Sequence, residues 1–228
     1  MVAKRKRSAE TQLGLLEAAG MVFAVKGYRD ATVEEICRRA HANIAAVNYH
    51  FGSKEKLYAA AWRHSFAQSL RSHPPDGGVD ESAPPEERLR GAVTALLHRI
   101  ADEDNREFPI AMRERANPTG LLNEVMRKDL QPQFMRLEKP VRELLGPVAM
   151  EQQVRFCTMS IISQCLDGGM LSRASAEKWR GKDAPPAIED VEAFAAHVLR
   201  FSVAGIAAFR GEGKKETRTR SHGPRKGR

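Results

Sequence analysis

Residues 32–54, TVEEICRRAHANIAAVNYHFGSK, constrain the fold of this chain more than any other stretch. Thr32 is of the residue type that precedes a helix, and Glu35 three positions later completes the pattern of a capping box. Apolar residues then recur at helical spacing, and Asn43 is a cap type for a second short helix. Because a turn this short makes two helices cross steeply, the stretch predicts a helix-turn-helix.

The second of these helices has one apolar and one polar face. Ile44, Val47 and Phe51 recur at i, i+3 and i+7, which predicts the buried face. The other face carries small residues followed by hydrogen-bonding ones, namely Ala45, Ala46, Asn48, Tyr49 and His50. Such a face suits a helix that contacts base edges and phosphates in a major groove. We therefore interpret it as a recognition helix.

The charge of the chain is concentrated at its two ends. The formal net charge is +8 and the sequence pI is about 9.6, which favours a polyanionic partner. Residues 1–8 carry four basic side chains, and residues 211–228 carry seven basic and two acidic ones. Residues 9–210 are therefore left with a formal charge of about −1. A protein that coats nucleic acid would spread its charge over the fold, so we expect a local contact with DNA.

Three further features of the composition bear on the compartment. The cysteines, Cys37, Cys157 and Cys165, have no CxxC spacing, which favours free thiols in a reducing compartment over disulfides or zinc. No uninterrupted apolar run approaches the roughly 20 residues that a membrane span needs. The basic start MVAKRKRSAE is not followed by the apolar segment of a signal peptide. These features predict a cytoplasmic protein without membrane contact.

Periodicity along the chain predicts an all-α protein of two domains. A helix from Ser8 or Ala9 to Lys26 precedes the helix-turn-helix, and a connecting helix follows from Ser53. The Pro- and Gly-rich stretch HPPDGGVDESAPP at residues 73–85 predicts a loop and a domain boundary. We expect a DNA-binding domain over residues 9–72, a helical domain over residues 86–210, and disordered basic tails over residues 1–8 and 211–228.

In the second domain we expect Pro132 to kink a helix and Pro140 to start another. Residues 150–171 predict a helix so apolar that it must be covered on several sides.

Two segments, LLEAAGMVFAVKGYRDATVEEICRRA and NIAAVNYHFGSKEKLY, resemble the DNA-binding domain of TetR-family transcriptional regulators. The match covers about 55 residues without a gap. The C-terminal half is similar to the CecR-type branch, which also carries NIAAVNYHFGSKE. The resemblance implies an N-terminal three-helix DNA-binding domain and a C-terminal ligand-binding and dimerisation domain. The chain departs from the family at His41 and Ala42, where glycine and valine are usual; histidine tolerates positive φ better than most residues.

The resemblance also implies which residues contact DNA. They are Tyr28, Thr32, Asn43, Ala45, Ala46, Asn48, Tyr49, His50 and Lys54. Thr32 and Asn43 would present helix N-termini to phosphate, and Asn48 could read adenine through two hydrogen bonds. Taken singly, Thr32 and Asn43 are ordinary caps and Tyr49 is a packing aromatic, but the whole set in register favours a DNA interface.

For the second domain the resemblance implies an inducer pocket and a homodimer formed through the last two long helices. Candidate pocket residues are Phe108, Met112, Met126, Phe134, Phe156, Met159 and Ile162, with Arg113 or Arg115 as polar anchors. Methionine and phenylalanine on such helices are more often core than pocket. The expected partners are therefore a double-stranded DNA operator, a second copy of the chain and a small-molecule inducer.

Two other classes of protein compete with this interpretation. The sequence contains no GxSxG, no HExxH, no phosphate-binding glycine loop and no Cys–His metal cluster, so we expect neither an enzyme nor a cofactor. The alternative is a non-specific or architectural DNA-binding protein that uses its basic tails. The sequence leaves open the operator, the inducer, the regulated genes and the choice between repressor and activator.

Overall fold

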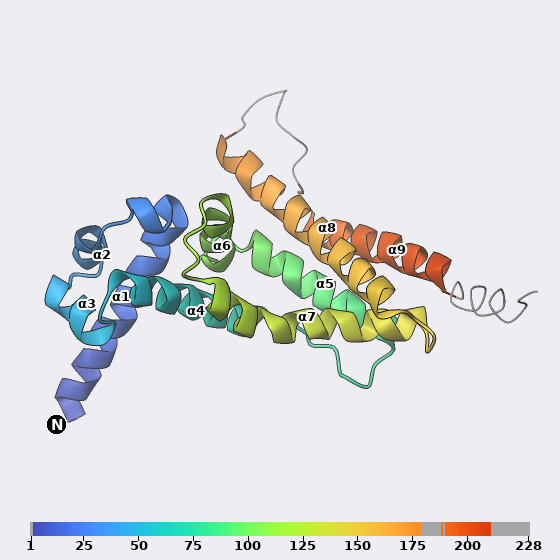
Figure 1. The fold of residues 1–228 in the computed structure, drawn as a ribbon, viewed down its shortest axis with the longest axis horizontal. Helices are drawn as coiled ribbons and strands as arrows, with labels where there is room; N and C mark the ends of the chain where they lie inside the picture. The colour runs from blue at the N-terminus through green and yellow to red at the C-terminus, as the bar shows by residue number, and fades with distance from the viewer. Residues whose placement is uncertain (1, 179–187, 189, 211–228) are drawn as a thin grey trace, which may run out of the picture. The chain divides into compact units, whose positions relative to one another are not determined.

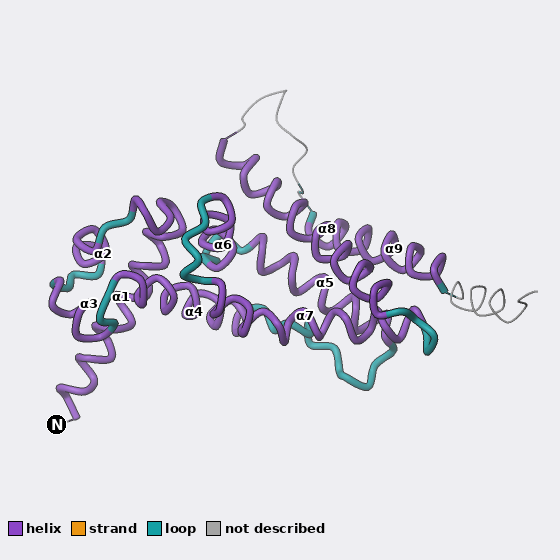
Figure 2. Tube along the Cα trace, in the orientation of Figure 1, coloured by secondary structure: helices purple, strands orange, loops and turns teal. Residues whose placement is uncertain are grey.

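The computed structural model describes residues 2–178, 188 and 190–210, and the regular structure in those residues is all helical (Figures 1 and 2). The predicted all-α class is confirmed. The helices are α1 Val2–Asp30, α2 Val33–Arg39, α3 Ile44–His50, α4 Lys54–Ser72, α5 Pro85–Ala101, α6 Glu107–Ala116, α7 Asn123–Leu145, α8 Glu151–Lys178 and α9 Val191–Phe209.

The chain forms two compact units that differ from the predicted domains. The first unit contains Met1–Ser72 and Asp102–Gln131, and the second contains His73–Ala101 and Pro132–Arg228. The sequence predicts a single boundary at residues 73–85, whereas residues 102–131 group with the helix-turn-helix segment. The reason is packing, since Ile110 and Leu122 are fully buried in the core of the first unit.

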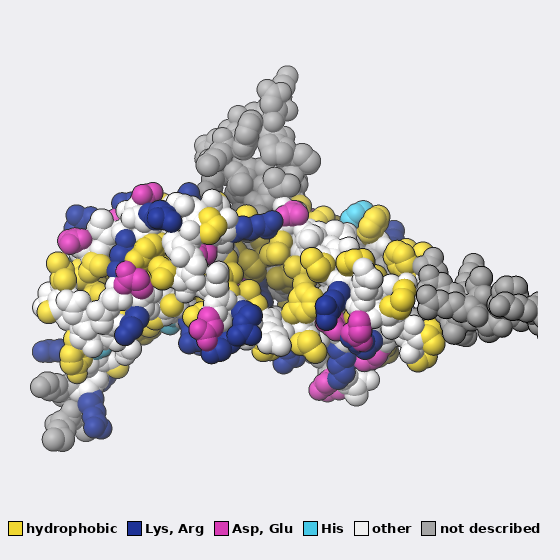
Figure 3. Space-filling model, in the orientation of Figure 1, with side chains coloured by type: hydrophobic (Ala, Val, Ile, Leu, Met, Phe, Trp, Pro, Cys, Tyr) yellow, Lys and Arg dark blue, Asp and Glu magenta, His cyan; other side chains and the backbone are white. Residues whose placement is uncertain are grey.

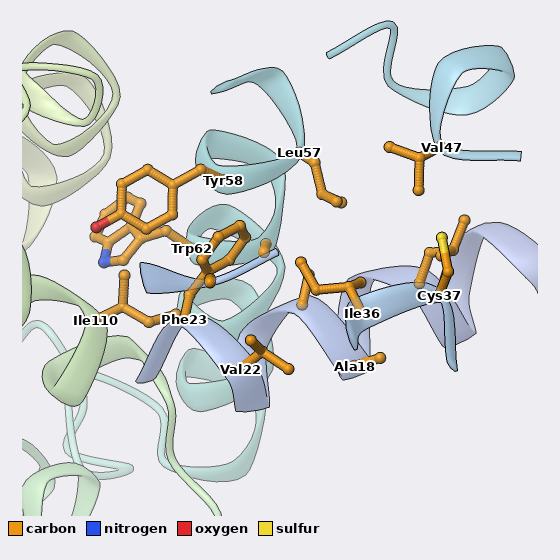
Figure 4. Close-up of a cluster of buried hydrophobic side chains, with 14 of the residues drawn as sticks. Ala18, Val22, Phe23, Ile36, Cys37, Val47, Leu57, Tyr58, Trp62 and Ile110 are labelled. Atoms are coloured by element: carbon orange, nitrogen blue, oxygen red, sulfur yellow. The ribbon is translucent and has the colours of Figure 1, made fainter. Parts of the chain in front are cut away.

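The core of the first unit is built mainly from α1, α2, α3 and α4, with Ile110 of α6 and Leu122 added to it (Figure 4). The predicted apolar face of α1 is buried, with Leu15, Ala19, Val22 and Phe23 at most 3% exposed. Ile36 from α2 and Val47 from α3 join this cluster, as predicted. Tyr58 and Trp62 of α4 are its largest fully buried side chains. Burial of an apolar side chain of this size stabilises a fold by about 1.5–3 kcal/mol.

The ends of α1 depart from the prediction. The helix begins at Val2, so residues 2–8, expected to be a disordered arm, are helical. Lysine, arginine and alanine are strong helix formers, which explains how the helix extends past Ser8. At the other end Gly27 breaks the helical backbone with φ 72° and ψ −175°, at the predicted stop. The predicted tail at residues 211–228 lies outside the described residues.

A buried carboxylate fixes the loop between α6 and α7. Glu114 of α6 is 7% exposed and accepts hydrogen bonds from the hydroxyl of Tyr58 (3.2 Å) and from the amides of Thr119 and Gly120 (2.9 Å each). The Thr119 hydroxyl also donates to it at 2.9 Å. Burying a charged group is costly unless it is paired or hydrogen-bonded. These donors offset that cost, and the burial and charge of the site raise the pKa of Tyr58.

The second unit is organised by α5, α8 and α9, which contact one another. Leu89, Val93 and Ile100 of α5 are at most 1% exposed, and so are Val154 and Ile161 of α8. The described side chains of α8 are not covered all round, however, because Phe156 and Met159 are 58% and 56% exposed. The expectation that α8 is covered on several sides is therefore not met within one chain.

Two sequence-based boundaries in the second unit are wrong. Pro132 and Pro140 both lie inside α7, although Pro140 was expected to start a separate helix. A proline inside a helix costs about 3 kcal/mol because it removes a backbone hydrogen bond. The helix continues because Leu137, Pro140 and Val141 are buried. Likewise α8 continues to Lys178, past residue 171, where the predicted helix ends, and residues 179–187 lie outside the described part.

The cysteines are free thiols, and Cys37 and Cys165 are buried while Cys157 is half-buried. Burial raises the pKa of Cys165 to about 12, so this thiol stays protonated and unreactive at neutral pH.

A glycine pair brings the 73–84 loop into backbone contact with α5. A Cβ atom added to Gly77 would lie 2.5 Å from the carbonyl oxygen of Gly91. A Cβ atom added to Gly91 would lie 2.3 Å from the carbonyl oxygen of Asp76 and 2.7 Å from Val79. Gly77 also has φ +62°, a conformation that other residues rarely adopt. The loop therefore docks on α5 only because both positions lack a side chain.

The substitution Gly91→Ala should lower the free energy of unfolding by about 1–3 kcal/mol, because backbone atoms cannot yield to the new methyl group. The measurement is chemical denaturation followed by circular dichroism. The control is Gly14→Ala in α1, where nothing lies within 4 Å of an added Cβ, and where alanine should stabilise the helix. An unchanged midpoint for Gly91→Ala would show that the loop is not docked as described.

Candidate nucleic-acid interface

The caps of α2 and α3 hold the helix-turn-helix as the sequence predicts. The amide of Glu35 donates to the hydroxyl of Thr32 at 3.1 Å, and the amide of Ala46 donates to the side-chain oxygen of Asn43 at 2.9 Å. The reciprocal half of the predicted capping box is replaced, because the Glu35 carboxylate pairs with Lys26 at 2.6 Å. Both caps are exposed at their helix N-termini, where backbone amides and the helix dipole favour a phosphate.

His41 makes the turn between the two helices. Its φ is +50°, and it has the only positive φ of a non-glycine residue in the part of the chain that the structure describes. The amides of His41 and Ala42 donate to the carbonyl oxygens of Arg38 (3.3 Å) and Cys37 (2.9 Å), which closes the end of α2. The departure from glycine at this position is thus accommodated by a strained backbone rather than by a different turn.

The two faces of α3 are divided by the burial of Val47, which is 1% exposed. On the opposite side Ala45 and Asn48 are exposed, and Tyr49 is 81% exposed. His50 is half-buried, and its ring contacts the edge of the Tyr49 ring with centroids 4.9 Å apart. Ala46 is also half-buried and packs against the core, so its methyl group is the least available of the predicted base contacts.

Tyr28, Lys54 and Glu55 form a small array of interacting side chains near α3. The Tyr28 hydroxyl donates to Glu55 Oε1 at 2.6 Å, and Lys54 Nζ lies 4.4 Å from the centre of the Tyr28 ring. This hydrogen bond raises the pKa of Tyr28 to about 12. Hydrogen bonds from Ser53 and Tyr28 lower the pKa of Glu55 to about 2. The Tyr28 hydroxyl is therefore bonded to Glu55, and the Tyr28 ring positions the Lys54 ammonium by a cation–π contact.

Sequence reasoning omitted two cations that the structure adds to this surface. Arg38 and Arg39 are exposed in the last turn of α2, a helix that contacts α3. The sequence carries a signal for them, because two adjacent arginines directly follow the apolar residues Ile36 and Cys37 at the end of this helix. Acidic and basic side chains are otherwise interspersed on the visible face of the molecule (Figure 3).

The predicted inducer residues are divided between the two compact units. Phe108, Met112, Arg113 and Met126 belong to the first unit, whereas Phe134, Phe156 and Met159 belong to the second. Phe108 is buried, Met126 packs on the core of the first unit, and Phe134 is half-buried. Met112, Arg113, Phe156 and Met159 are exposed. A groove of about 760 Å³ in the second unit is lined by none of these seven residues.

The described residues contain no group of three or more His, Cys, Asp or Glu side chains that could hold a metal ion. The surface around α3 instead carries a set of hydrogen-bonding and cationic groups, which suits a polyanion.

Comparison with known families places both parts of the chain. Residues 15–61 match the family described as "Bacterial regulatory proteins, tetR family". Residues 85–206, more than half of the chain, match "HTH-type transcriptional dual regulator CecR, C-terminal domain". The first match contains α2 and α3, and the second contains the helices α5 to α8 and most of α9.

Individual relatives are regulators of the same kind. The chain is 28% identical to the dual regulator CecR of Shigella flexneri, over 67% of this chain and 72% of that protein. It is 28% identical to the regulator SrpR of Pseudomonas putida, over 54% of this chain and only 56% of that protein.

Solved structures show the same fold. A TetR-like regulator from Rhodococcus sp. RHA1 has a TM-score of 0.66 at 17% identity, covering 86% of this chain and 96% of that one. The regulator FadR of Bacillus subtilis, solved with stearoyl-CoA, has a TM-score of 0.66 at 18% identity, covering 85% and 98% of the two chains.

The substitution His41→Gly should raise the free energy of unfolding by about 1 kcal/mol, because glycine adopts positive φ without strain. Thermal denaturation of the two proteins measures this difference. His41→Ala is the matched control and should give no gain, since it keeps the Cβ atom and therefore the strain. Equal stabilisation by both substitutions would mean that the imidazole, not the backbone, is unfavourable there.

Proposed function

Because the chain belongs to the TetR family of bacterial regulatory proteins and carries a C-terminal domain of the CecR type, we propose that it is a ligand-responsive repressor that binds a palindromic operator as a homodimer. The relatives and fold neighbours are transcriptional regulators, which are not enzymes. The proposal includes the cytoplasm as the compartment, where a protein of this kind meets DNA.

The observation that carries the proposal is the outward face of α3. Val47 is buried and both N-terminal caps are formed, so Asn48 and Tyr49 point into solvent from a fixed backbone. An asparagine held in this way can make two hydrogen bonds to adenine, and the exposed Ala45 methyl group can contact thymine. Tyr49 and His50 lie beside Asn48 and supply hydrogen-bonding groups for phosphate or base edges.

Phosphate contacts would set the position of α3 in the groove. The exposed caps Thr32 and Asn43 offer helix N-termini, and Lys54 offers an ammonium group supported by the Tyr28 ring. Arg38 and Arg39 add two further cations near the same helix. In this arrangement Tyr28 acts by positioning Lys54 rather than by its own hydroxyl, which is bonded to Glu55.

A dimer through α8 and α9 is supported by the apolar side chains that these helices leave exposed. Phe156 and Met159 of α8 are 58% and 56% exposed, and Phe201 of α9 is 64% exposed. Contiguous exposed apolar surface is typical of protein interfaces. The pairing of α8 and α9 with their copies would bury these side chains and complete the cover that the composition of α8 requires.

α9 is also the one described helix that is long and apolar enough to cross a membrane, which the sequence analysis did not expect. Its contacts with α5 and α8 and its place in the CecR-type domain favour the dimer interpretation.

Ligand response would act by population shift. A dimer reads two half-sites about 34–36 Å apart, or a multiple of that distance. A ligand that prefers a spacing of the two α3 helices unsuited to the operator lowers the affinity for DNA, and only by the ratio of its affinities for the two states.

A non-specific DNA-binding protein is the alternative, and selection of bound duplexes from a random pool separates the two. A palindromic consensus supports the proposed repressor, whereas recovery without a consensus supports the alternative.

The substitution Asn48→Ala should weaken binding to the selected operator by about 1–3 kcal/mol while leaving binding to unrelated duplexes almost unchanged. Fluorescence anisotropy titrations with both duplexes measure the two affinities. Asn123→Ala, at an exposed asparagine that starts α7, is the control and should bind as the parent protein does. A uniform loss on all duplexes would contradict base reading by Asn48.

The substitution Phe201→Glu should convert the protein to a monomer, because an unpaired charge in an apolar interface costs several kcal/mol. Light scattering coupled to size-exclusion chromatography measures the mass. Val25→Glu in α1, at a side chain that is 66% exposed compared with 64% for Phe201, controls for added charge and should leave the dimer intact. A dimer that survives Phe201→Glu and also Phe156→Glu would exclude this interface.

A further inference from the structure

A groove of about 760 Å³ lies within the second unit, between the 73–84 loop, α5 and the C-terminal half of α7. Pockets of a few hundred to a thousand Å³ are typical of small-molecule sites. Its apolar wall includes Val79 of the loop, Ala92 of α5 and Met135 of α7. Arg88, Arg136 and Lys139 bring cations to the same groove. The groove therefore combines an apolar surface with guanidinium and ammonium groups.

Ion pairs join the loop to α7 across the groove. Glu81 of the loop is paired with Lys139, and Asp76 lies 3.8 Å from Arg136. The second pair is longer than a hydrogen bond, so the Arg136 guanidinium has a charge partner and no hydrogen-bonded acceptor among the described residues. The groove's other acid, Glu138, is bonded to Arg142 at 2.7 Å. Of the charged groups lining the groove, Arg136 is thus the one best placed to accept a new partner of opposite charge.

An orphaned acceptor lies one helical turn from Arg136. The side-chain oxygen Oε1 of Gln133 is buried and has no hydrogen-bond partner among the described residues. Gln133 and Arg136 both line a small recess of about 30 Å³, and Arg136 also lines the large groove. A buried acceptor without a donor costs about 1–3 kcal/mol. An occupant of this recess would have to supply an N–H or O–H group, and at about 30 Å³ the recess has room only for a water-sized group.

From these observations we propose that the groove is the effector site of this protein and binds an amphipathic carboxylate, with its anionic group on Arg136 and its apolar body against Val79, Ala92 and Met135. The proposal rests on the proposed ligand-responsive function and assigns the site of the ligand. A carboxylate fits because guanidinium groups bind it through two parallel hydrogen bonds.

The bound carboxylate replaces Asp76 as the partner of Arg136. An exposed pair such as Asp76–Arg136 contributes only about 0–1 kcal/mol, so its loss costs little. The loop then keeps its backbone contact at Gly77 and Gly91 and its ion pair at Glu81. Because the loop directly follows α4 in the chain, a ligand that changes the loop acts on the segment that joins the connecting helix to α5.

The test is isothermal titration calorimetry of the full-length protein with decanoate and 3-hydroxydecanoate, with decylamine and decanol as probes of equal chain length. We expect both carboxylates to bind, and the amine and alcohol to bind at least about tenfold more weakly. Arg136→Gln should weaken carboxylate binding about tenfold, because it removes the charge and keeps most of the side chain. Arg127→Gln, at an exposed arginine of α7 outside the groove, is the matched control and should change nothing.

Three results would overturn the proposal. They are no binding of either carboxylate, equal binding of decylamine, and equal weakening by Arg136→Gln and Arg127→Gln. Operator affinity is measured in the same samples, which separates this site from the proposed function. Saturable, Arg136-dependent binding that leaves operator affinity unchanged would support the site and overturn the ligand response. Sequence-specific DNA binding without carboxylate binding would overturn the proposed ligand site and leave the proposed DNA-binding function standing.

Discussion

Burial of Val47 is the constraint on which the DNA-facing surface depends. A helix of seven residues has no stability of its own in water, so α3 exists only because one side of it is packed. Val47 provides that packing with Ile36 and Leu57, as Figure 4 shows, and the caps at Thr32 and Asn43 fix both helix starts. Because Val47 faces the core, Asn48 and Tyr49 on the opposite side of α3 face solvent. A substitution in α3 can therefore change both the DNA-facing surface and the stability of the helix-turn-helix.

Signals from neighbouring residues predicted the helix-turn-helix well, and contacts between distant residues explain most of the features that the sequence did not predict. Cap types, apolar spacing and the glycine at residue 27 are properties of neighbouring residues, and they gave the bounds of α2 and α3 closely. The partner of the Glu35 carboxylate is Lys26, which comes from another helix. The burial of Ile110 and Leu122 in the first unit likewise depends on tertiary packing, which periodicity does not encode. The same holds for α7, where buried side chains outweigh the cost of two prolines.

The predicted pocket residues lie in different environments in the structure, and the reason is physical. Methionine and phenylalanine serve equally in a core, a ligand pocket or an interface between chains. Phe108 proved to be buried, whereas Phe156 and Met159 are exposed, and nothing in their residue type separates these outcomes. The groove at Arg136 involves a Pro- and Gly-rich loop, charged residues of α7 and the glycine contact on α5, none of which follows an apolar pattern. Only the three-dimensional arrangement joins them.

The hydrogen bonds to Glu114 have a practical consequence for engineering the chain. Because the amides of Thr119 and Gly120 are the donors that make this buried carboxylate tolerable, the connection between α6 and α7 has a fixed length. A reporter domain or epitope inserted there would separate the buried Glu114 carboxylate from its hydrogen-bond donors. Surface connections with freer backbone, such as the exposed residues between α7 and α8, are the better positions for grafting.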